Sequence, residues 1–503
     1  MTGVFFVLNK NYIYKLWSCF MAKVLFINPN KWGRGITHIW IASHSSALKK
    51  KNHKVELFDC TFYSNWTDNE VSYATSTGMF KSTNYENYIK YNKNSVFSDL
   101  QDKIDKFQPD IIFWSALSSH IHAEGEYVNI QNGYDVLSKI NIDKAIKITG
   151  GLQATAAPEI VLKNFENINY LITGESEIVL TQIADNIDQR LDFTQIDGLA
   201  YIKNNKFYKN NKQKIIDSLD KFSPYDYDIF DDQVFFRPYN KEVVRAIDFE
   251  LSRGCIYSCS YCVETIIQKY YGFTDSSKKT GAISNFKSYL RNKSAEVIYN
   301  EIKYLHEEKK IQLFRCQDTN FLTNDKNILT QLSELFEKNE LNISLYIETR
   351  PEGINENSIK LLKKLRVKGV GMGVELASEN FRENELNRFA SQSKTIDAFK
   401  LLRKNNIMTT TYNVIGFPNQ SEESIIQTIA FNKILDPDNI TVAFYSPYYG
   451  TGQHRAGVKS GDFNEYEFGA DSALRSTSRS IALTKEKLEY YKKNFVRLAR
   501  EKK

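Results

Sequence analysis

Apolar residues in the first 190 positions form short continuous runs separated by stretches with helical spacing. The runs lie at residues 24–30 (VLFINPN), 53–59 (HKVELFD), 109–116 (PDIIFWSA), 145–151 (AIKITGG) and 168–177 (INYLITGESE), and the helical stretches include 39–50 and 178–187. Continuous apolar strands that alternate with helices are typical of a parallel sheet covered on both faces. The pattern therefore predicts a doubly wound, Rossmann-like α/β domain over residues 21–190.

The pattern changes after residue 190. Residues 197–216 alternate apolar and polar positions around Asn204 and Asn205, which predicts a β-hairpin. The following stretch is rich in Asn, Asp and Tyr and contains the breakers Pro224 and Pro238. We interpret residues 191–242 as a hairpin and linker between two domains.

A second series of strands and helices follows and repeats regularly. Strands are expected within 246–254, 311–318, 343–350, 370–375, 409–417 and 440–446, and helices within 295–308, 327–338, 357–365, 394–404 and 422–433. Six strands joined by five helices predict a partial (β/α)6 barrel over residues 243–447, with functional residues at the carboxyl ends of the strands. Residues 448–503 are expected to form a short helical C-terminus.

Composition agrees with a multidomain globular protein. The 503 residues are 42% hydrophobic and 25% charged, which excludes a disordered or low-complexity chain. The net charge of +6 is small for this length, so we expect no nucleic-acid partner.

The N-terminus predicts neither a membrane segment nor secretion. The apolar run at residues 4–8 is followed by Asn9, Lys10 and Asn11, so it is too short to span a bilayer. Met21 directly precedes the first strand and is interpreted as the functional start. With only six cysteines, unevenly placed, the chain is expected to be cytoplasmic and free of a disulfide framework.

Three of the cysteines indicate a metal centre. Cys255, Cys259 and Cys262 follow the first barrel strand with C-x3-C-x2-C spacing. Thiolates favour iron–sulfur clusters or zinc over hard cations, and a structural zinc site would need a fourth ligand, which the neighbouring sequence lacks. Three thiolates on a four-iron cluster leave one iron open to an exogenous ligand. A structural zinc or iron–sulfur protein is the non-enzymatic alternative.

This cysteine motif, with Tyr261 before its last cysteine, resembles the radical S-adenosylmethionine (SAM) superfamily. The resemblance implies a [4Fe-4S] cluster whose open iron binds SAM, which is cleaved to a 5′-deoxyadenosyl radical. It places Asp318 and Asn320 near the methionine part of SAM, Glu375 at the ribose, and Ile415 and Gly416 along the adenine. Arg388 fits a family position that often carries Lys or Arg. An open iron also implies oxygen sensitivity.

The order of a doubly wound domain before the barrel resembles the cobalamin (B12)-binding radical SAM subfamily. The residues of this chain at the cofactor-facing strand ends are Asn28, Ser115, Gly150, Gly151, Gln153, Gly174 and Glu175. Two departures stand out: no D-x-H-x-x-G signature is present, and Gln153 occupies a position where relatives often have His. The resemblance therefore implies a cobalamin without a protein ligand to cobalt, and loss of the cobalamin site is the alternative.

The predicted function is cobalamin-dependent C-methylation of an unactivated carbon in a small molecule or peptide. The alternative within the same class is a radical SAM cyclase or oxidoreductase that transfers no methyl group. The resemblance also implies an electron donor such as flavodoxin or ferredoxin. The sequence does not distinguish these chemistries.

Overall fold

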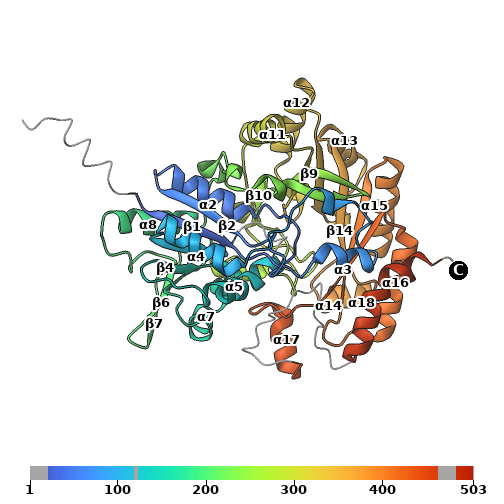
Figure 1. Cartoon of the computed structure of the whole chain (residues 1–503). Coiled ribbons are helices and arrows are strands. Elements are labelled where there is room, and N and C mark those ends of the chain that lie inside the picture. The colour runs from blue at the N-terminus through green and yellow to red at the C-terminus, as the bar shows by residue number, and fades with distance from the viewer. Residues whose placement is uncertain (1–20, 118–122, 463–482, 502–503) are drawn as a thin grey trace, which may run out of the picture.

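The computed structural model describes residues 21–117, 123–462 and 483–501. Two seven-stranded sheets organise the chain, one in the N-terminal half and one in the C-terminal half, and they lie side by side in Figure 1. The expected start at Met21 concerns residues 1–20, which lie outside the described part, as does much of the C-terminal segment.

The first sheet has the strand order β2-β1-β3-β4-β5-β6-β7, and the first five strands are parallel neighbours. Its parallel strands are β1 (Lys23–Asn28), β2 (Lys54–Asp59), β3 (Ile111–Trp114), β4 (Ile146–Thr149) and β5 (Tyr170–Ile172). Helices between them are α2 (Ile39–Lys49), α3 (Glu70–Ser76), α4 (Val96–Phe107), α5 (Ala123–Leu137), α6 (Gly151–Ala156), α7 (Pro158–Asn164) and α8 (Glu177–Asp188).

Alternate residues of β1 enter two different cores, as expected for a sheet covered on both faces. Val24 and Phe26 pack in the core that contains residues of α2 and α8, whereas Leu25 and Ile27 pack in the core that contains residues of α4, α5 and α7. All four side chains are fully buried. The predicted doubly wound domain is confirmed.

The hairpin belongs to this first sheet. Strands β6 (Leu199–Lys203) and β7 (Lys206–Lys209) pair antiparallel with each other, and β6 pairs antiparallel with β5. Asn204 and Asn205 both have positive φ angles, of 51° and 59°, which suits the tight turn between twisted strands. The sequence placed this hairpin in the linker, but its main-chain hydrogen bonds extend the sheet of the first domain.

The second sheet is an open half-barrel with the order β16-β15-β14-β13-β12-β9-β8. The six expected strands are parallel: β9 (Glu242–Phe249), β12 (Leu313–Cys316), β13 (Ser344–Thr349), β14 (Val367–Glu375), β15 (Met408–Ile415) and β16 (Asn439–Phe444). A seventh strand, β8 (Phe236–Tyr239), pairs antiparallel with β9 and was not expected. Pro238 is tolerated there because β8 is an edge strand. The partial barrel is confirmed.

Helices join the barrel strands and cover their outer side (Figure 1). The five expected helices are α11 (Ala295–Lys309), α12 (Lys326–Lys338), α13 (Glu356–Lys364), α15 (Gln392–Lys404) and α16 (Glu422–Leu435), and the shorter elements are β10 (Ser252–Arg253), α9 (Glu264–Tyr271), α10 (Phe286–Tyr289), β11 (Arg291–Asn292) and α14 (Glu379–Asn384). Two C-terminal helices follow, α17 (Gly452–Ser460) and α18 (Lys485–Arg500), and α18 packs on α16 and β16. Among the described helices, none has the length and apolar character needed to cross a bilayer.

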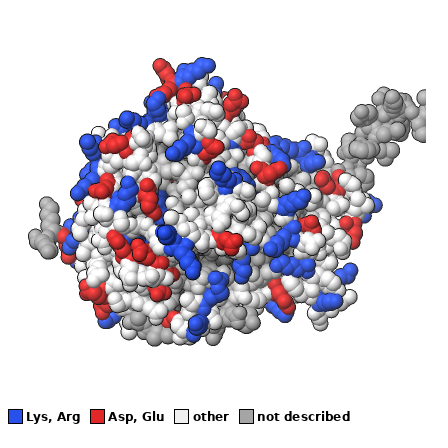
Figure 2. Space-filling view, turned by 180° about the vertical axis from the view of Figure 1, so that it is seen from behind, with Lys and Arg blue, Asp and Glu red and all other residues white. Residues whose placement is uncertain are grey.

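The molecular surface on the side shown in Figure 2 carries basic and acidic side chains in alternation. Blue and red side chains are neighbours over most of this face, and no extended area of one sign is present in this view. Such mixing gives no broad electrostatic attraction for a polyanion on this face.

Candidate active site

The three-cysteine segment is a loop between β10 and α9 at the carboxyl end of β9. It begins at Gly254, whose φ of +101° is a conformation that glycine adopts readily. A Cβ at this position would lie 2.7 Å from the carbonyl oxygen of Tyr289, so the close approach also requires glycine. The loop is held from α9 by Gln268, whose amide donates to the carbonyls of Cys255 and Tyr257 at 3.0 and 2.9 Å.

The cysteine side chains are buried or half-buried and face charged neighbours. Cys255 and Cys259 are buried, and Cys262 is half-buried. Burial raises the pKa of the Cys255 thiol, and the nearby Glu264 carboxylate raises it further. Arg350 lies beside Cys259, with its Nη1 3.8 Å from the sulfur, and its guanidinium stacks 3.7 Å from the centroid of the Tyr257 ring. Positive charge at this point suits a centre that carries thiolates.

The cysteine loop supplies the ligands that a cluster needs. In the described residues, no three His, Cys, Asp or Glu side chains converge on one point that could hold a metal ion. Each thiolate of a four-iron cluster binds a different iron, so its ligands surround a larger volume. The C-x3-C-x2-C spacing supplies three such thiolates from one loop.

Glu375 connects the end of β14 to the cysteine loop. It sits in a bulge where the register between β14 and β15 shifts, and its φ is +60°, which is strained for a residue with a side chain. Its Oε1 accepts a hydrogen bond of 2.9 Å from the hydroxyl of Tyr261 and lies 3.9 Å from Nη2 of Arg388. A Cβ on Gly373 would lie 2.2 Å from this oxygen, so the preceding glycine is required too.

The other residues expected near SAM have separate surroundings. Gly416, with φ of +84°, ends β15 after the buried Ile415, and the next residue, Phe417, packs edge-on against Tyr261 at 5.8 Å. Asp318 is fully buried and accepts hydrogen bonds from Ser252 and from the backbone of Leu251; burial raises its pKa to about 6, although these bonds oppose the shift. It therefore braces the segment before the cysteines.

Asn320 turns towards the neighbouring strand. Its Oδ1 accepts a hydrogen bond of 2.7 Å from the hydroxyl of Thr349 at the end of β13. The structure thus brings Tyr261, Glu375, Arg388 and Gly416 together beside the cysteines, and places Asp318 and Asn320 in the supporting wall.

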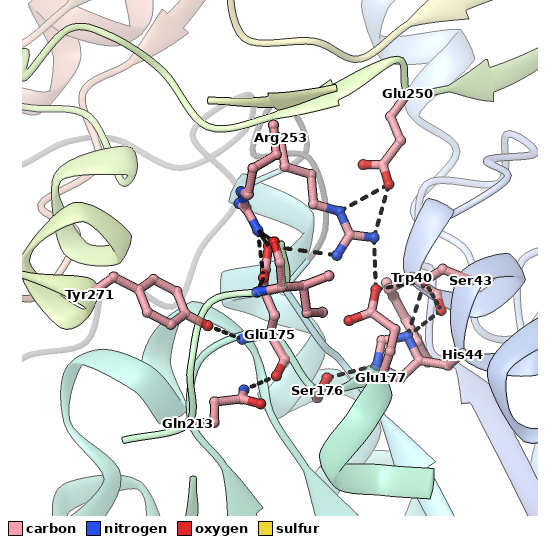
Figure 3. Close-up of polar contacts among 12 residues, drawn as sticks. Trp40, Ser43, His44, Glu175, Ser176, Glu177, Gln213, Glu250, Arg253 and Tyr271 are labelled. Carbon is pink, nitrogen blue, oxygen red and sulfur yellow. Dashed lines mark hydrogen bonds and ion pairs between the residues drawn. The ribbon is translucent and has the colours of Figure 1, made fainter. Parts of the chain in front are cut away.

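A buried ionic cluster fastens the cysteine loop to the first domain (Figure 3). Arg253, two residues before Cys255, contacts Glu177 at 2.7 Å, Glu250 at 2.9 Å and Glu175 at 3.7 Å. Glu175 also pairs with Arg291 at 2.8 Å. All five side chains are buried, so three carboxylates depend on two guanidinium groups. We call these five residues the interdomain ion cluster.

The first-domain side of this cluster is held by α2. Ser43 donates to Glu177 at 3.0 Å, and the imidazole of His44 is bonded to Ser176 at 2.7 Å (Figure 3). Burial alone would raise the pKa of Glu177, but the charge of Arg253, the neighbouring His44 and the hydrogen bonds that Glu177 accepts together outweigh burial and hold this pKa at about 2. Burial lowers the pKa of His44, which favours a neutral ring beside the ion pairs.

The strand ends expected to face a cobalamin lie at the boundary with the barrel. Ser115 has a φ of +63°, and its carbonyl accepts a hydrogen bond of 2.9 Å from the backbone of Gly150. A Cβ on Gly151 would lie 2.8 Å from the Ser115 hydroxyl. Gln153 is 3% exposed, and its Oε1 has no hydrogen-bond partner in the described residues.

The remaining strand-end residues have partners of their own. Asn28 is fully buried and donates to Asp59 at 3.1 Å. Gly174 approaches Tyr270 and Tyr271 closely enough that a Cβ would lie 2.6 to 2.7 Å from their rings and hydroxyl. The strand-end residues predicted to face cobalamin therefore form two groups. One is a small-residue group around Ser115 and Gln153. The other contacts the barrel or the neighbouring strand.

An apolar contact covers the small-residue group. Leu117 and Leu152 of the first domain share a core with Val263, Ile266 and Ile267 of the barrel. Small residues and an unpartnered buried amide oxygen suit a large cofactor at this edge. A flat macrocycle between the domains would have to separate this contact.

A cavity of about 430 Å3 occupies the lumen of the half-barrel. Its walls come from inward-facing residues of β12, β13, β15 and β16, and residues 70–81 of the first domain line its other side. Glu348, in this wall, lies two residues before Arg350, so both side chains lie on the same face of the chain. Glu348 therefore lies in the cavity wall one strand position away from the end of β13, where Arg350 contacts Cys259.

Comparison with known families identifies the second domain. A model described as the radical SAM superfamily matches residues 249–431, which include the cysteine loop and β12 to β15. Residues 249–431 form a radical SAM domain. The sequence-based recognition of the family is confirmed.

Relatives of known sequence are distant. An uncharacterized methyltransferase of Pyrococcus horikoshii is 26% identical over 71% of this chain and 71% of its own length. An anaerobic magnesium-protoporphyrin IX monomethyl ester cyclase of Rubrivivax gelatinosus is 24% identical over 76% of this chain and 65% of its own length. The chain thus spans about two thirds of such relatives.

Solved radical SAM structures share the whole two-domain architecture. TsrM from Kitasatospora setae, a methyltransferase solved with cobalamin and a [4Fe-4S] cluster, superposes with a TM-score of 0.65 at 16% identity, covering 94% of this chain and 85% of that chain. The cobalamin-dependent enzyme OxsB, solved with aqua-cobalamin, gives 0.55 at 14% identity, covering 93% and 59%. At these identities the likeness establishes the fold.

The sequence reasoning missed Arg350, Arg253 and Glu348. Arg350 ends the third expected barrel strand, and the rule that strand ends carry function could have found it. Arg253 directly precedes the cysteine motif, but two of its three carboxylate partners, Glu175 and Glu177, are far away in sequence. Glu348 lies inside a strand, where alternation alone does not show that the inward face is hollow.

Replacing Arg253 is expected to destabilise the protein more than replacing an exposed cation. The variant Arg253→Met leaves Glu175, Glu177 and Glu250 buried with one guanidinium, and breaking a buried ion pair costs about 3 to 5 kcal/mol. Arg253→Lys should restore part of this loss. Anaerobic thermal unfolding and iron content measure the effect, with the exposed Arg497→Gln as the control. Equal unfolding temperatures for Arg253→Met and the control would contradict this role.

Proposed function

We propose that this radical SAM enzyme is a cobalamin-dependent C-methyltransferase that acts on an unactivated carbon. The observation that carries the proposal is the Cys255–Cys259–Cys262 loop at the mouth of a half-barrel, linked through Tyr261 to Glu375. The name of the Pyrococcus relative and the fold of TsrM support the methyl transfer.

The cluster would be held by Cys255, Cys259 and Cys262. SAM would lie between this loop and the ends of β14 and β15, with Glu375 accepting hydrogen bonds from ribose hydroxyls and the backbone at Ile415 and Gly416 beside the adenine. Arg388 and Tyr261 fix the Glu375 carboxylate in that position. Arg350 supplies positive charge beside Cys259.

When bound, the cluster and SAM supply a 5′-deoxyadenosyl radical by one-electron cleavage, and cobalamin supplies the methyl group. Cobalamin would lie on the first-domain edge at Ser115, Gly150, Gly151 and Gln153, with Gln153 at the position where relatives often have His. The chain's own residues would bind the cofactors, bury the reaction and hold the substrate in the lumen. A one-electron donor such as flavodoxin or ferredoxin would complete the cycle.

A cyclase or oxidoreductase without methyl transfer is the second candidate. It is favoured by the relatives named anaerobic magnesium-protoporphyrin IX monomethyl ester cyclases, which align with 76% and 89% of this chain. The two candidates share the cysteine loop and the SAM site and differ in the product formed.

The cysteine triad is expected to be essential for iron binding and SAM cleavage. Replacing Cys255, Cys259 and Cys262 by Ala removes all three thiolates that the four-iron cluster needs. Iron analysis and 5′-deoxyadenosine production under strict anaerobiosis measure the outcome, with Cys316→Ala as the matched control because Cys316 is buried in β12. Production of 5′-deoxyadenosine by the triple variant would refute the assignment.

Glu375 is expected to set the affinity for SAM. Glu375→Gln keeps the shape of the side chain but removes its charge, and a hydrogen bond to a charged group is worth about 1.5 to 3 kcal/mol, so SAM binding should weaken roughly tenfold or more. Equilibrium binding of SAM to cluster-loaded protein gives the Kd. Glu352→Gln, next to Arg350, serves as the control for a lost carboxylate. An unchanged Kd in Glu375→Gln would reject the ribose contact.

Cobalamin is expected to bind stoichiometrically in a base-off state. Protein produced with hydroxocobalamin should retain the cofactor through gel filtration, and its absorption spectrum should lack a nitrogen ligand to cobalt because Gln153 replaces the usual imidazole. The variant Gly151→Leu should lose cobalamin but keep the iron, since a side chain at this φ of +91° is strained beside Ser115. Complete loss of cobalamin from the unmodified protein would favour the candidate without methyl transfer.

A further inference from the structure

The lumen cavity has an uneven distribution of charge. Arg34 forms a buried ion pair with Glu70 at 3.1 Å, so these two charges cancel. Arg237 and Arg315 both face one carboxylate, Asp248, at 3.0 and 3.7 Å. One positive charge is therefore left over on the deep wall of the cavity.

Two donors on that wall are available to a ligand. Arg237 is 2% exposed, and its Nη1 is buried without a hydrogen-bond partner in the described residues. The Arg315 side chain is 27% exposed and lines the cavity; among the residues that the structure describes, it makes the long ion pair to Asp248 and a ring contact to Tyr346 at 5.9 Å. Leaving such donors unsatisfied is costly, so an acceptor from a ligand is the expected partner.

The remaining acidic group in the lumen adds little negative charge at neutral pH. Burial raises the pKa of Glu348 to about 8, although a hydrogen bond of 2.5 Å from Tyr412 and the charge of Arg315 oppose the shift. Tyr412 is in turn bonded to Tyr346 at 3.0 Å. Because protonated Glu348 is neutral, it does not cancel the excess positive charge of Arg237 and Arg315.

The opposite side of the cavity is apolar at its centre. Trp32, Ala74, Met79 and Phe80 of the first domain line it, beside the Arg34–Glu70 ion pair and Lys81, whose Nζ donates to Asn240 at 2.9 Å. An apolar wall that faces a small number of oriented polar groups is characteristic of small-molecule sites.

We propose that the lumen cavity binds an organic monocarboxylate, with its carboxylate on Arg315 and Arg237 and its apolar body against Trp32, Met79 and Phe80. This proposal rests on the proposed function, because it names the substrate class of that radical SAM site. The single excess positive charge on the wall formed by Arg237 and Arg315 matches a monoanion. A phosphate would bring a second negative charge close to Asp248 and Glu70.

Direct binding tests the proposal without catalysis. The probes are 2-naphthoate, the neutral 2-naphthalenemethanol and the dianionic 2-naphthyl phosphate, titrated calorimetrically into anaerobic, cluster-loaded protein. We expect 2-naphthoate to bind about tenfold or more tighter than the alcohol. Arg315→Gln should abolish this preference while keeping the affinity for the alcohol, and Arg315→Lys should retain part of it.

The controls separate the possible failures. Arg497→Gln on α18 removes an exposed cation far from the lumen and should keep the preference for 2-naphthoate. Equal affinity for naphthoate and alcohol, no binding of naphthoate, tighter binding of the phosphate, or an unchanged preference in Arg315→Gln would each overturn the proposal. SAM cleavage is measured separately, so a protein that cleaves SAM but lacks the preference would refute the carboxylate and leave the radical SAM function standing.

Discussion

The buried contact of Arg253 with three carboxylates is the constraint on which the arrangement of the two domains depends. Glu175 and Glu177 come from the end of β5 and the start of α8, Glu250 follows β9, and Arg253 lies two residues before the first cysteine. Desolvated charges are stable only when their partners stay in place, so the first domain and the cysteine loop have one permitted relative position. The loop itself needs Gly254 and the bonds from Gln268 to keep its shape. The position of the cysteine loop therefore depends partly on residues outside the barrel.

Local sequence patterns predicted most of the fold because strands and helices alternate regularly along the chain in both domains. The runs around Val24 and Ile111 are apolar on both faces, and buried parallel strands require that. The strand β8 and the sheet position of the hairpin could not be predicted, because both depend on which edge is free to pair. For the active site, spacing alone predicted the cysteines. The positions of Arg253 and Arg350 relative to the thiols depend on contacts over 70 residues or more, as the ion pair of Arg253 with Glu177 illustrates.

The carboxylates that the family resemblance predicts near SAM are buried, and one of them also has a strained backbone. Glu375 has a left-handed backbone in a β-bulge, and its carboxylate is tied to Tyr261 and faces Arg388. Asp318, expected beside SAM, instead braces the segment that leads into the cysteines. A conformation that costs free energy persists only where surrounding contacts determine it fully, and here those contacts come from the cysteine loop itself. The Glu375 carboxylate and the cysteine loop are therefore held in place by the same contacts.

The closing of the lumen by residues 70–81 has a consequence for how this architecture can change. A half-barrel taken alone would be open between its two edge strands, and its hollow would be a groove filled with water. Here the missing wall is formed by residues 70–81 of the first domain. That domain contacts the barrel through the packed interface and the connecting chain. A new first domain grafted onto this barrel would bring a different wall and hence a different pocket. The shape of this cavity is therefore a property of the two domains together and of neither domain alone.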